Sequence, residues 1–135
     1  MRILLGNSQL VSPHVSIVLL DWSCRESFHI LDYLEKQTIP RTQYEVIWIE
    51  YYDRKAEQIE KKLSDCELSG KPPILDQWVV METPQNVYFH KHLMYNTGIF
   101  LIRGRIIVNC DSDPIVRETF ALMIIVFKLT RVNPK

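Results

Sequence analysis

Four short stretches of the chain have the hydrophobic pattern of β-strands. Val15–Leu20 is an almost continuous run of β-branched and aliphatic residues, and Tyr44–Ile49 repeats this pattern. Continuous apolar runs of this length are typical of strands that are covered on both faces of a sheet. Gln77–Met81 and Ile106–Cys110 have a similar character and follow a breaker cluster at Ser69–Pro73. The sequence therefore predicts four strands.

Segments with helical periodicity separate these strands. Ser23–Glu26 has the Ser-x-x-Glu form of a capping box, and apolar residues recur after it at helical spacing until Pro40. Asp53 is placed to cap a second, charged helix over Arg54–Leu63. We therefore predict two helices in the first half of the chain.

Two more helices are predicted in the second half. Apolar residues recur at helical spacing over Tyr88–Arg103, and Gly104 is placed to end that helix. Asp113–Pro114 supplies a cap followed by a proline at the first helical position, which predicts a last helix over 115–129. Strands that alternate with helices predict an α/β fold with a mostly parallel sheet and helices on both faces.

The composition is that of one ordinary globular domain. The 135 residues are 47% hydrophobic and 24% charged, and 16 Lys plus Arg balance 16 Asp plus Glu. We interpret residues 1–135 as a single domain with an N-terminal extension over 1–13. Because the formal net charge is zero and no basic stripe is visible, we expect no nucleic-acid partner.

No segment has the length or the flanks of a targeting or membrane-spanning sequence. The longest apolar run, Ala121–Phe127, has seven residues, against the ~20 that are needed to cross a bilayer. The expected location is cytoplasmic, with a peripheral position at a membrane as the alternative. Ala121–Phe127 is apolar around the whole helix circumference and needs cover on several sides. We expect either a homodimer through the helix 115–129 or an aggregation-prone patch.

Acidic residues follow three of the four predicted strands. Asp21 follows the first strand, Glu50 the second, and Asp111 with Asp113 the fourth. In a parallel sheet these carboxylates share the carboxyl edge, where ligands of such folds bind. Carboxylates ~4 Å apart repel each other by about 1 kcal/mol even in water, so we expect a divalent cation, or the hydroxyls of a sugar or ribose, to offset the repulsion. Both fit a nucleotide-sugar or another diphosphate ligand.

The segment Asp111-Ser112-Asp113 can direct two carboxylates to one ligand, because residues i and i+2 of an extended backbone point the same way. In the alternative interpretation, Asp113 only caps the helix begun by Pro114, and Asp111 is a solvated loop residue. The residues alone leave both interpretations open.

Five segments of the chain, in their order and spacing, resemble family 2 glycosyltransferases, which have a GT-A fold. The resemblance covers roughly residues 14 to 120. The segments are Val15–Leu20, Leu34–Pro40, Tyr44–Glu50, Asn96–Ile99 with Arg103-Gly104, and Ile106–Asp113.

The resemblance implies metal-dependent transfer of a sugar, with inversion, from a nucleotide-diphosphate sugar to an acceptor hydroxyl. It implies a UDP-sugar as donor, a glycan or lipid-linked acceptor, and Mn²⁺ or Mg²⁺ as the cofactor. Asp111 is expected to meet the ribose and Asp113 the metal that bridges the diphosphate, with both acids at the metal site. The residues expected to bind the donor nucleotide are Leu20, Asp21, Trp22, Glu50 and Asp111.

The chain departs from the family's pattern around the expected donor site. Leu20–Ser23 stands where the family usually has Pro-Thr-Tyr-Asn, and Glu50 replaces the usual Asp. Tyr51-Tyr52 stands in place of Asp-Gly, and Tyr95 takes the place of a common Arg. We therefore expect a reshaped nucleoside pocket.

The family's acceptor site and general base come after the segment that matches Asp113, and only 22 residues follow Asp113. We therefore expect the acceptor half to be absent, and the residues name no general base. The chain is expected to be the donor-binding half of a longer enzyme. The alternative is a noncatalytic truncated homologue that acts as a nucleotide-sugar-binding or protein-interaction module.

Overall fold

The structure, a computed structural model, describes residues 1–6 and 12–132. Residues 7–11 of the expected N-terminal extension lie outside the described residues. The described chain forms an α/β fold around one five-stranded, mostly parallel sheet with the order β1-β4-β3-β2-β5. The strands are β1 (Arg2–Leu5), β2 (Val15–Asp21), β3 (Tyr44–Glu50), β4 (Gln77–Val80) and β5 (Ile106–Asp111). The predicted α/β class with a mostly parallel sheet and the four predicted strands are confirmed.

Strand β1 was not predicted. It pairs antiparallel with β4 at one edge of the sheet, whereas the other neighbouring strands pair in parallel. The sequence placed Arg2–Leu5 in the N-terminal extension because four residues at a sheet edge are too few to show a strand period. The extension therefore contributes a strand to the sheet.

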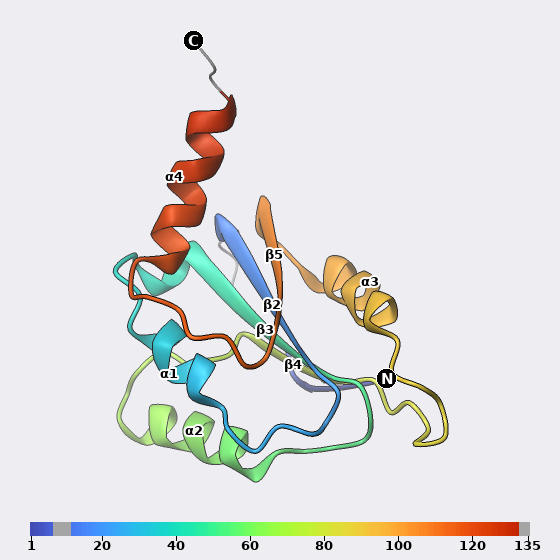
Figure 1. Ribbon diagram of the computed structural model, residues 1–135. Coiled ribbons are helices and arrows are strands. Elements are labelled where there is room, and N and C mark those ends of the chain that lie inside the picture. Colours follow the sequence, from blue (N-terminus) through green and yellow to red (C-terminus); the bar gives the residue numbers. More distant parts are fainter. Residues whose placement is uncertain (7–11, 133–135) are drawn as a thin grey trace.

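Helices cover both faces of the sheet (Figure 1). α1 and α2 lie on one face, and α3 lies on the other. α4 extends away from the sheet near the start of β2. The helices are α1 (His29–Glu35), the 3₁₀ turn η1 (Arg41–Gln43), α2 (Glu57–Leu68), α3 (Lys91–Leu101) and α4 (Phe120–Val132).

All four predicted helices begin later than expected: α3 begins at Lys91 rather than at Tyr88, and in the other three the expected capping side chain has a tertiary partner instead. Ser23 donates a hydrogen bond to Glu50, and α1 begins six residues after Ser23, with Phe28 at its N-cap position. Asp53 pairs with Arg2, and α2 begins at Glu57. Asp113 pairs with Arg25, so α4 begins at Phe120 rather than at Ile115.

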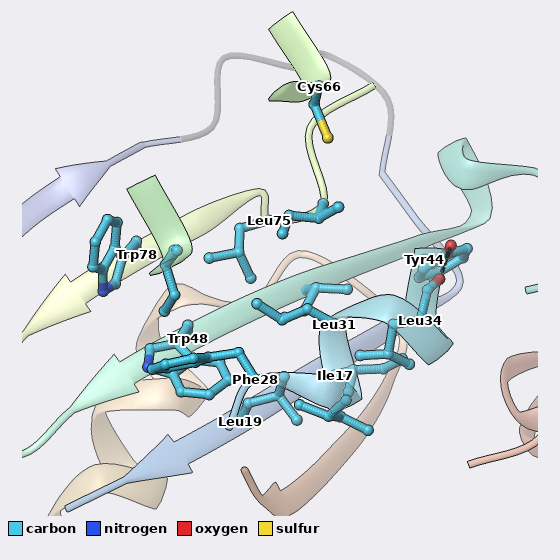
Figure 2. Packing of buried hydrophobic residues seen from close by; sticks show 14 of the residues in the cluster. Ile17, Leu19, Phe28, Leu31, Leu34, Tyr44, Trp48, Cys66, Leu75 and Trp78 are labelled. Carbon is cyan, nitrogen blue, oxygen red and sulfur yellow. Dashed lines mark hydrogen bonds between the residues drawn. The ribbon is translucent and has the colours of Figure 1, made fainter. Parts of the chain in front are cut away.

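The main core lies between the sheet and the helices α1 and α2 (Figure 2). The Phe28 and Trp48 rings pack with their centroids 5.3 Å apart. The Tyr44 hydroxyl donates to the backbone carbonyl of Leu34 at 2.6 Å, which joins the start of β3 to the end of α1. Because Ile17, Leu19 and the rings of Phe28 and Trp48 fill this layer, the carboxyl end of β2 is held rigidly.

The second core is smaller and lies under α3. Met94 is fully buried there against Val18, Leu20 and Ile47. A Cβ on Gly98 would come within 2.7 Å of Val18 Cγ1, so glycine allows α3 to approach β2 closely. Helix packing on the sheet therefore explains the glycine inside this helix.

The outer side of α4 is apolar and exposed. Phe120, Ala121, Ile124 and Ile125 pack on the main core. Leu122, Met123, Val126 and Phe127 are exposed on the other side of the helix, where i, i+3 and i+4 neighbours adjoin. Among the described residues, no helix combines the length and apolar character that a bilayer crossing requires.

We expect this exposed side of α4 to drive self-association at increasing protein concentration. Replacing Phe127, which is 57% exposed, by Lys is expected to shift the sedimentation coefficient toward that of a monomer. Thr130→Lys is the control, because it adds the same charge to the same helix without removing an apolar side chain. A wild-type chain that remains monomeric at high concentration would contradict this prediction.

Candidate donor site

The carboxyl ends of three neighbouring strands bring the predicted acidic residues to one edge of the sheet. In the parallel ladders, Asp21 of β2 lies opposite Glu50 of β3, and Leu20 of β2 lies opposite Asp111 of β5. Asp113 follows Asp111 by two residues. The shared edge that the strand pattern predicts is therefore present.

Glu50 is fully buried, and both of its carboxylate oxygens are bonded within the chain. Arg54 Nη2 donates to Oε1 at 2.8 Å, and Trp48 Nε1 donates to the same oxygen at 3.0 Å. Ser23 Oγ donates to Oε2 at 2.8 Å. Burial raises the pKa of Glu50, and the bonds from Arg54, Trp48 and Ser23 oppose that rise. Through its bond to Ser23, Glu50 therefore fixes the position of the turn that follows β2.

Asp21 is buried beside Glu50 and shares its cation. Arg54 Nη2 lies 3.5 Å from Asp21 Oδ1, and the backbone N–H of Cys24 donates to that oxygen at 3.1 Å. The buried Ser112 donates from Oγ to Asp21 Oδ2 at 2.7 Å. These bonds join the segment after β5 to the turn after β2.

The turn after β2 contains a strained residue. Ser23 has a φ of 65°, a left-handed conformation that costs a non-glycine residue about 1–3 kcal/mol. Two bonds hold it there, because Ser23 Oγ donates to Glu50 and accepts from the backbone N–H of Tyr52 at 3.3 Å. This turn carries Trp22 and Arg25 to the edge of the sheet.

Asp111 and Asp113 have the opposite environment, because both are exposed while Ser112 between them is buried. Lys91 Nζ, at the start of α3, lies 2.6 Å from Asp111 Oδ1. Arg25 Nη2 lies 2.8 Å from Asp113 Oδ2. All four side chains are between 37% and 50% exposed. The two acids are therefore accessible to a ligand, and each already has a cation beside it.

A cavity of about 190 Å³ opens between these groups. Trp22, which is 48% exposed, packs against Phe89 with ring centroids 5.4 Å apart and planes tilted by 56°. Phe89 is supported from behind by the buried ring of Tyr51, with the centroids 5.1 Å apart. The cavity is lined by Leu20, Trp22, Arg25, Phe89, Lys91, Asp111 and Ser112.

Three of the predicted donor-site residues, Leu20, Trp22 and Asp111, line this cavity. Asp21 and Glu50 do not line it, because both are buried beneath the turn. Asp113 does not line the cavity either, but it pairs with Arg25, which does. The structure therefore divides the predicted set into residues that line the cavity and residues that do not.

Sequence reasoning missed the two cations of the cavity, Arg25 and Lys91. Arg25 follows β2 by four residues, so the rule that ligands bind beyond the carboxyl ends of strands could have found it. The sequence pattern instead assigns Arg25 to a capping box over Ser23–Glu26, which the structure does not contain. Lys91 has no such signal, because its distance from the sheet edge depends on how α3 packs against β2.

A larger cavity, of about 420 Å³, lies at the other end of the parallel strands, near the starts of β3 and β4. α1 ends there, and the segments before β3 and β4 border the same space. None of its lining residues is a predicted site residue, and Arg41, whose side chain is 20% exposed, is bonded to Asp76. The lining residues are Glu35, Lys36, Arg41, Lys71, Pro72, Pro73 and Ile74.

The exposed carboxylates of Asp111 and Asp113 are the type of ligand that the expected cation, Mn²⁺ or Mg²⁺, prefers. Among the described residues, no three His, Cys, Asp or Glu side chains gather into a metal-binding group. Mg²⁺ is commonly held by one or two carboxylates together with substrate phosphates, and it does not require a protein cage. Two accessible carboxylates at i and i+2, next to a cavity with two cations, are of this kind.

No protein-family model matches the chain, and a search of the curated proteins finds no significant match. The resemblance to family 2 glycosyltransferases therefore rests on the residues of this sequence alone.

Proposed function

We propose that this chain binds a nucleotide-diphosphate sugar at the carboxyl edge of its sheet, as the donor-binding part of a metal-dependent, inverting family 2 glycosyltransferase with a GT-A fold. One observation carries the proposal. An exposed aromatic ring, two cations and an exposed carboxylate, those of Trp22, Arg25, Lys91 and Asp111, line a single cavity beyond the strand ends. The mostly parallel sheet supports it.

Each lining group suits one part of a nucleoside diphosphate, and we propose a UDP-sugar as the donor. The exposed Trp22 ring offers a face on which a base can stack. Arg25 and Lys91 are donors for phosphate oxygens, with charge-assisted hydrogen bonds. A volume of about 190 Å³ is below the roughly 300 Å³ of small-molecule pockets. The cavity therefore suits the diphosphate and adjacent ribose, with the sugar outside.

The buried acids take a positioning role in this proposal. Glu50 and Asp21 hold Arg54, Ser23 and Ser112, as described above, so they set the shape of the turn that presents Trp22 and Arg25. Neither carboxylate reaches the cavity, which departs from the nucleoside contacts that the resemblance implies. We assign the contacts to the exposed residues instead.

Asp111 and Asp113 would hold the Mn²⁺ or Mg²⁺. When bound, this cation neutralises the charge that develops on the departing nucleoside diphosphate. Arg25 and Lys91 bring further positive charge to the same place. An acceptor hydroxyl, from a glycan or a lipid-linked acceptor, would then displace the diphosphate directly with inversion of the anomeric carbon, and its proton would pass to a general base for which no residue of this chain is named.

A noncatalytic binding module is the second candidate, and the burial of Asp21 and Glu50 favours it. With these two acids occupied by Arg54, fewer polar groups are open to a nucleoside than the resemblance implies. The two candidates differ in turnover. A binding module retains UDP-sugar without releasing UDP, whereas an active enzyme releases UDP when an acceptor is supplied.

Calorimetric titration with UDP in the presence of Mn²⁺ tests the proposal. We expect the wild-type chain to bind, and Asp113→Asn to weaken binding by roughly tenfold or more, since loss of a metal-site group has effects of this size. Asp65→Asn removes the same charge from the exposed surface of α2 and is expected to bind like the wild type. Absence of binding, or equal binding by Asp113→Asn, would remove the proposal.

A further inference from the structure

The exposed acids and the cavity cations neutralise one another in two separate pairs. Lys91 of α3 pairs with Asp111 at 2.6 Å, and Arg25 of the turn after β2 pairs with Asp113 at 2.8 Å. The two pairs come from different elements, yet Arg25, Lys91 and Asp111 line the same cavity. The four groups together carry no net charge.

These pairs can open far more easily than the buried pair beneath them. Their side chains are 37% to 50% exposed, and exposed pairs contribute little to stability because water and salt screen them. The pair between Arg54 and Glu50 is different, since the Glu50 side chain is fully buried and separation would leave a buried charge alone. The two exposed ion pairs at the carboxyl ends of the strands can therefore exchange partners, whereas the buried pair of Arg54 and Glu50 cannot.

Each member of the exposed pairs is suited to a partner other than its present one. Lys and Arg side chains bind phosphate oxygens well, and carboxylates are the natural ligands of Mg²⁺ or Mn²⁺. A diphosphate that binds Arg25 and Lys91 frees both carboxylates. A divalent cation that binds Asp111 and Asp113 frees both cationic side chains.

Resting on the proposed function, we propose that the divalent cation and the diphosphate enter this site as a linked pair, by exchange of partners with the Asp111–Lys91 and Asp113–Arg25 ion pairs. Either ligand alone must break these pairs, and it provides a new partner only for the carboxylates or only for the cationic side chains. The second ligand then finds its protein partners already released. The coupling is reciprocal, so each ligand raises the affinity for the other by the same factor.

Removing a cavity cation is expected to improve binding of the metal alone, because the carboxylate that it pairs with is then free. We expect Lys91→Met and Arg25→Met each to raise the affinity for Mn²⁺ by roughly two- to fivefold, the range for opening an exposed pair. The same variants are expected to lose part of the enhancement that UDP gives to Mn²⁺ binding. Lys36→Met is the control, because it removes one positive charge outside the site.

The measurement is the electron paramagnetic resonance signal of free Mn²⁺ during titration of each protein, with and without UDP, at about 0.15 M salt, where charges beyond ~8 Å are screened. Urea unfolding of each variant checks that the fold is kept. Tighter Mn²⁺ binding by both variants and not by Lys36→Met supports the exchange. Unchanged or weaker Mn²⁺ binding, or no Mn²⁺ binding by any protein, overturns it. If UDP binds with Mn²⁺ but the variants leave Mn²⁺ affinity unchanged, the proposed function stands and the exchange fails.

Discussion

Replacing Arg54 by Met is expected to lower the free energy of unfolding by about 3–5 kcal/mol at pH 7.5. Arg54 lies 2.8 Å from Glu50 and 3.5 Å from Asp21, and both carboxylate side chains are completely buried. Met keeps much of the side-chain volume but leaves two buried negative charges without a cation. Such charges cost far more than the loss of an exposed ion pair.

The loss is expected to be smaller at pH 5 than at pH 7.5. Burial already raises the pKa of Glu50 above its ordinary value of 4.5, and Arg54 opposes that rise. When the pKa of a carboxyl group is higher in the folded protein than in the unfolded chain, the protein loses stability as the pH rises from the unfolded pKa through the folded pKa. Without Arg54 the folded pKa rises further, so the variant recovers stability as the pH falls toward 5.

Urea unfolding at the two pH values measures this effect. Lys55→Met is the matched control, because Lys55 pairs with Glu60 at the surface, where both side chains are about half exposed. Its expected cost is within about 1 kcal/mol and does not depend on Glu50. A loss in Arg54→Met no larger than that of Lys55→Met would show that the buried acids do not depend on this cation.

Gly104→Ala is expected to lower the free energy of unfolding by about 2–3 kcal/mol. A Cβ at Gly104 would lie 2.6 Å from Ser16 Oγ, 2.8 Å from Ser16 N and 2.9 Å from the carbonyl carbon of Val15. Two of these atoms are backbone atoms of β2, which is paired on both sides by β3 and β5, and they cannot move aside. The bond from Gly104 N–H to Ser16 Oγ, at 2.8 Å, would also be displaced.

Thermal or urea unfolding tests this prediction against Gly6→Ala. The nearest atom to a Cβ at Gly6 is Ile3 Cγ2, at an ordinary contact distance of 3.8 Å. We expect that control to change stability by no more than about 0.5 kcal/mol. Equal stability of the two variants would mean that the chain around Gly104 is free to shift.

The strands could be predicted because burial on both faces leaves a direct record in the sequence. Val15–Leu20 and Tyr44–Ile49 are apolar at nearly every position, and core residues cover them on both faces of the sheet. The helix starts could not be predicted, because a side chain that could cap a helix can bind a distant side chain instead. Asp113 has the correct type and place for a cap, but Arg25, 88 residues earlier in the chain, binds it instead.

The acidic edge of the candidate site followed from topology, since parallel strands end on the same side of a sheet. Which acids face solvent did not follow. Glu50 is buried because Arg54, from the loop before α2, folds back over it. Lys91 reaches Asp111 because glycine at position 98 lets α3 approach Val18. Both contacts depend on packing between elements, which no local pattern of residues encodes.

Backbone amide chemical shifts recorded during titration with UDP and Mg²⁺ locate the nucleotide, because the two cavities lie at opposite ends of the parallel strands. Binding at the proposed site predicts that the largest changes fall on Leu20–Arg25, Phe89–Lys91 and Asp111–Asp113. Largest changes on Glu35–Arg41 and Lys71–Ile74, which border the larger cavity, would contradict it, as would the absence of any change.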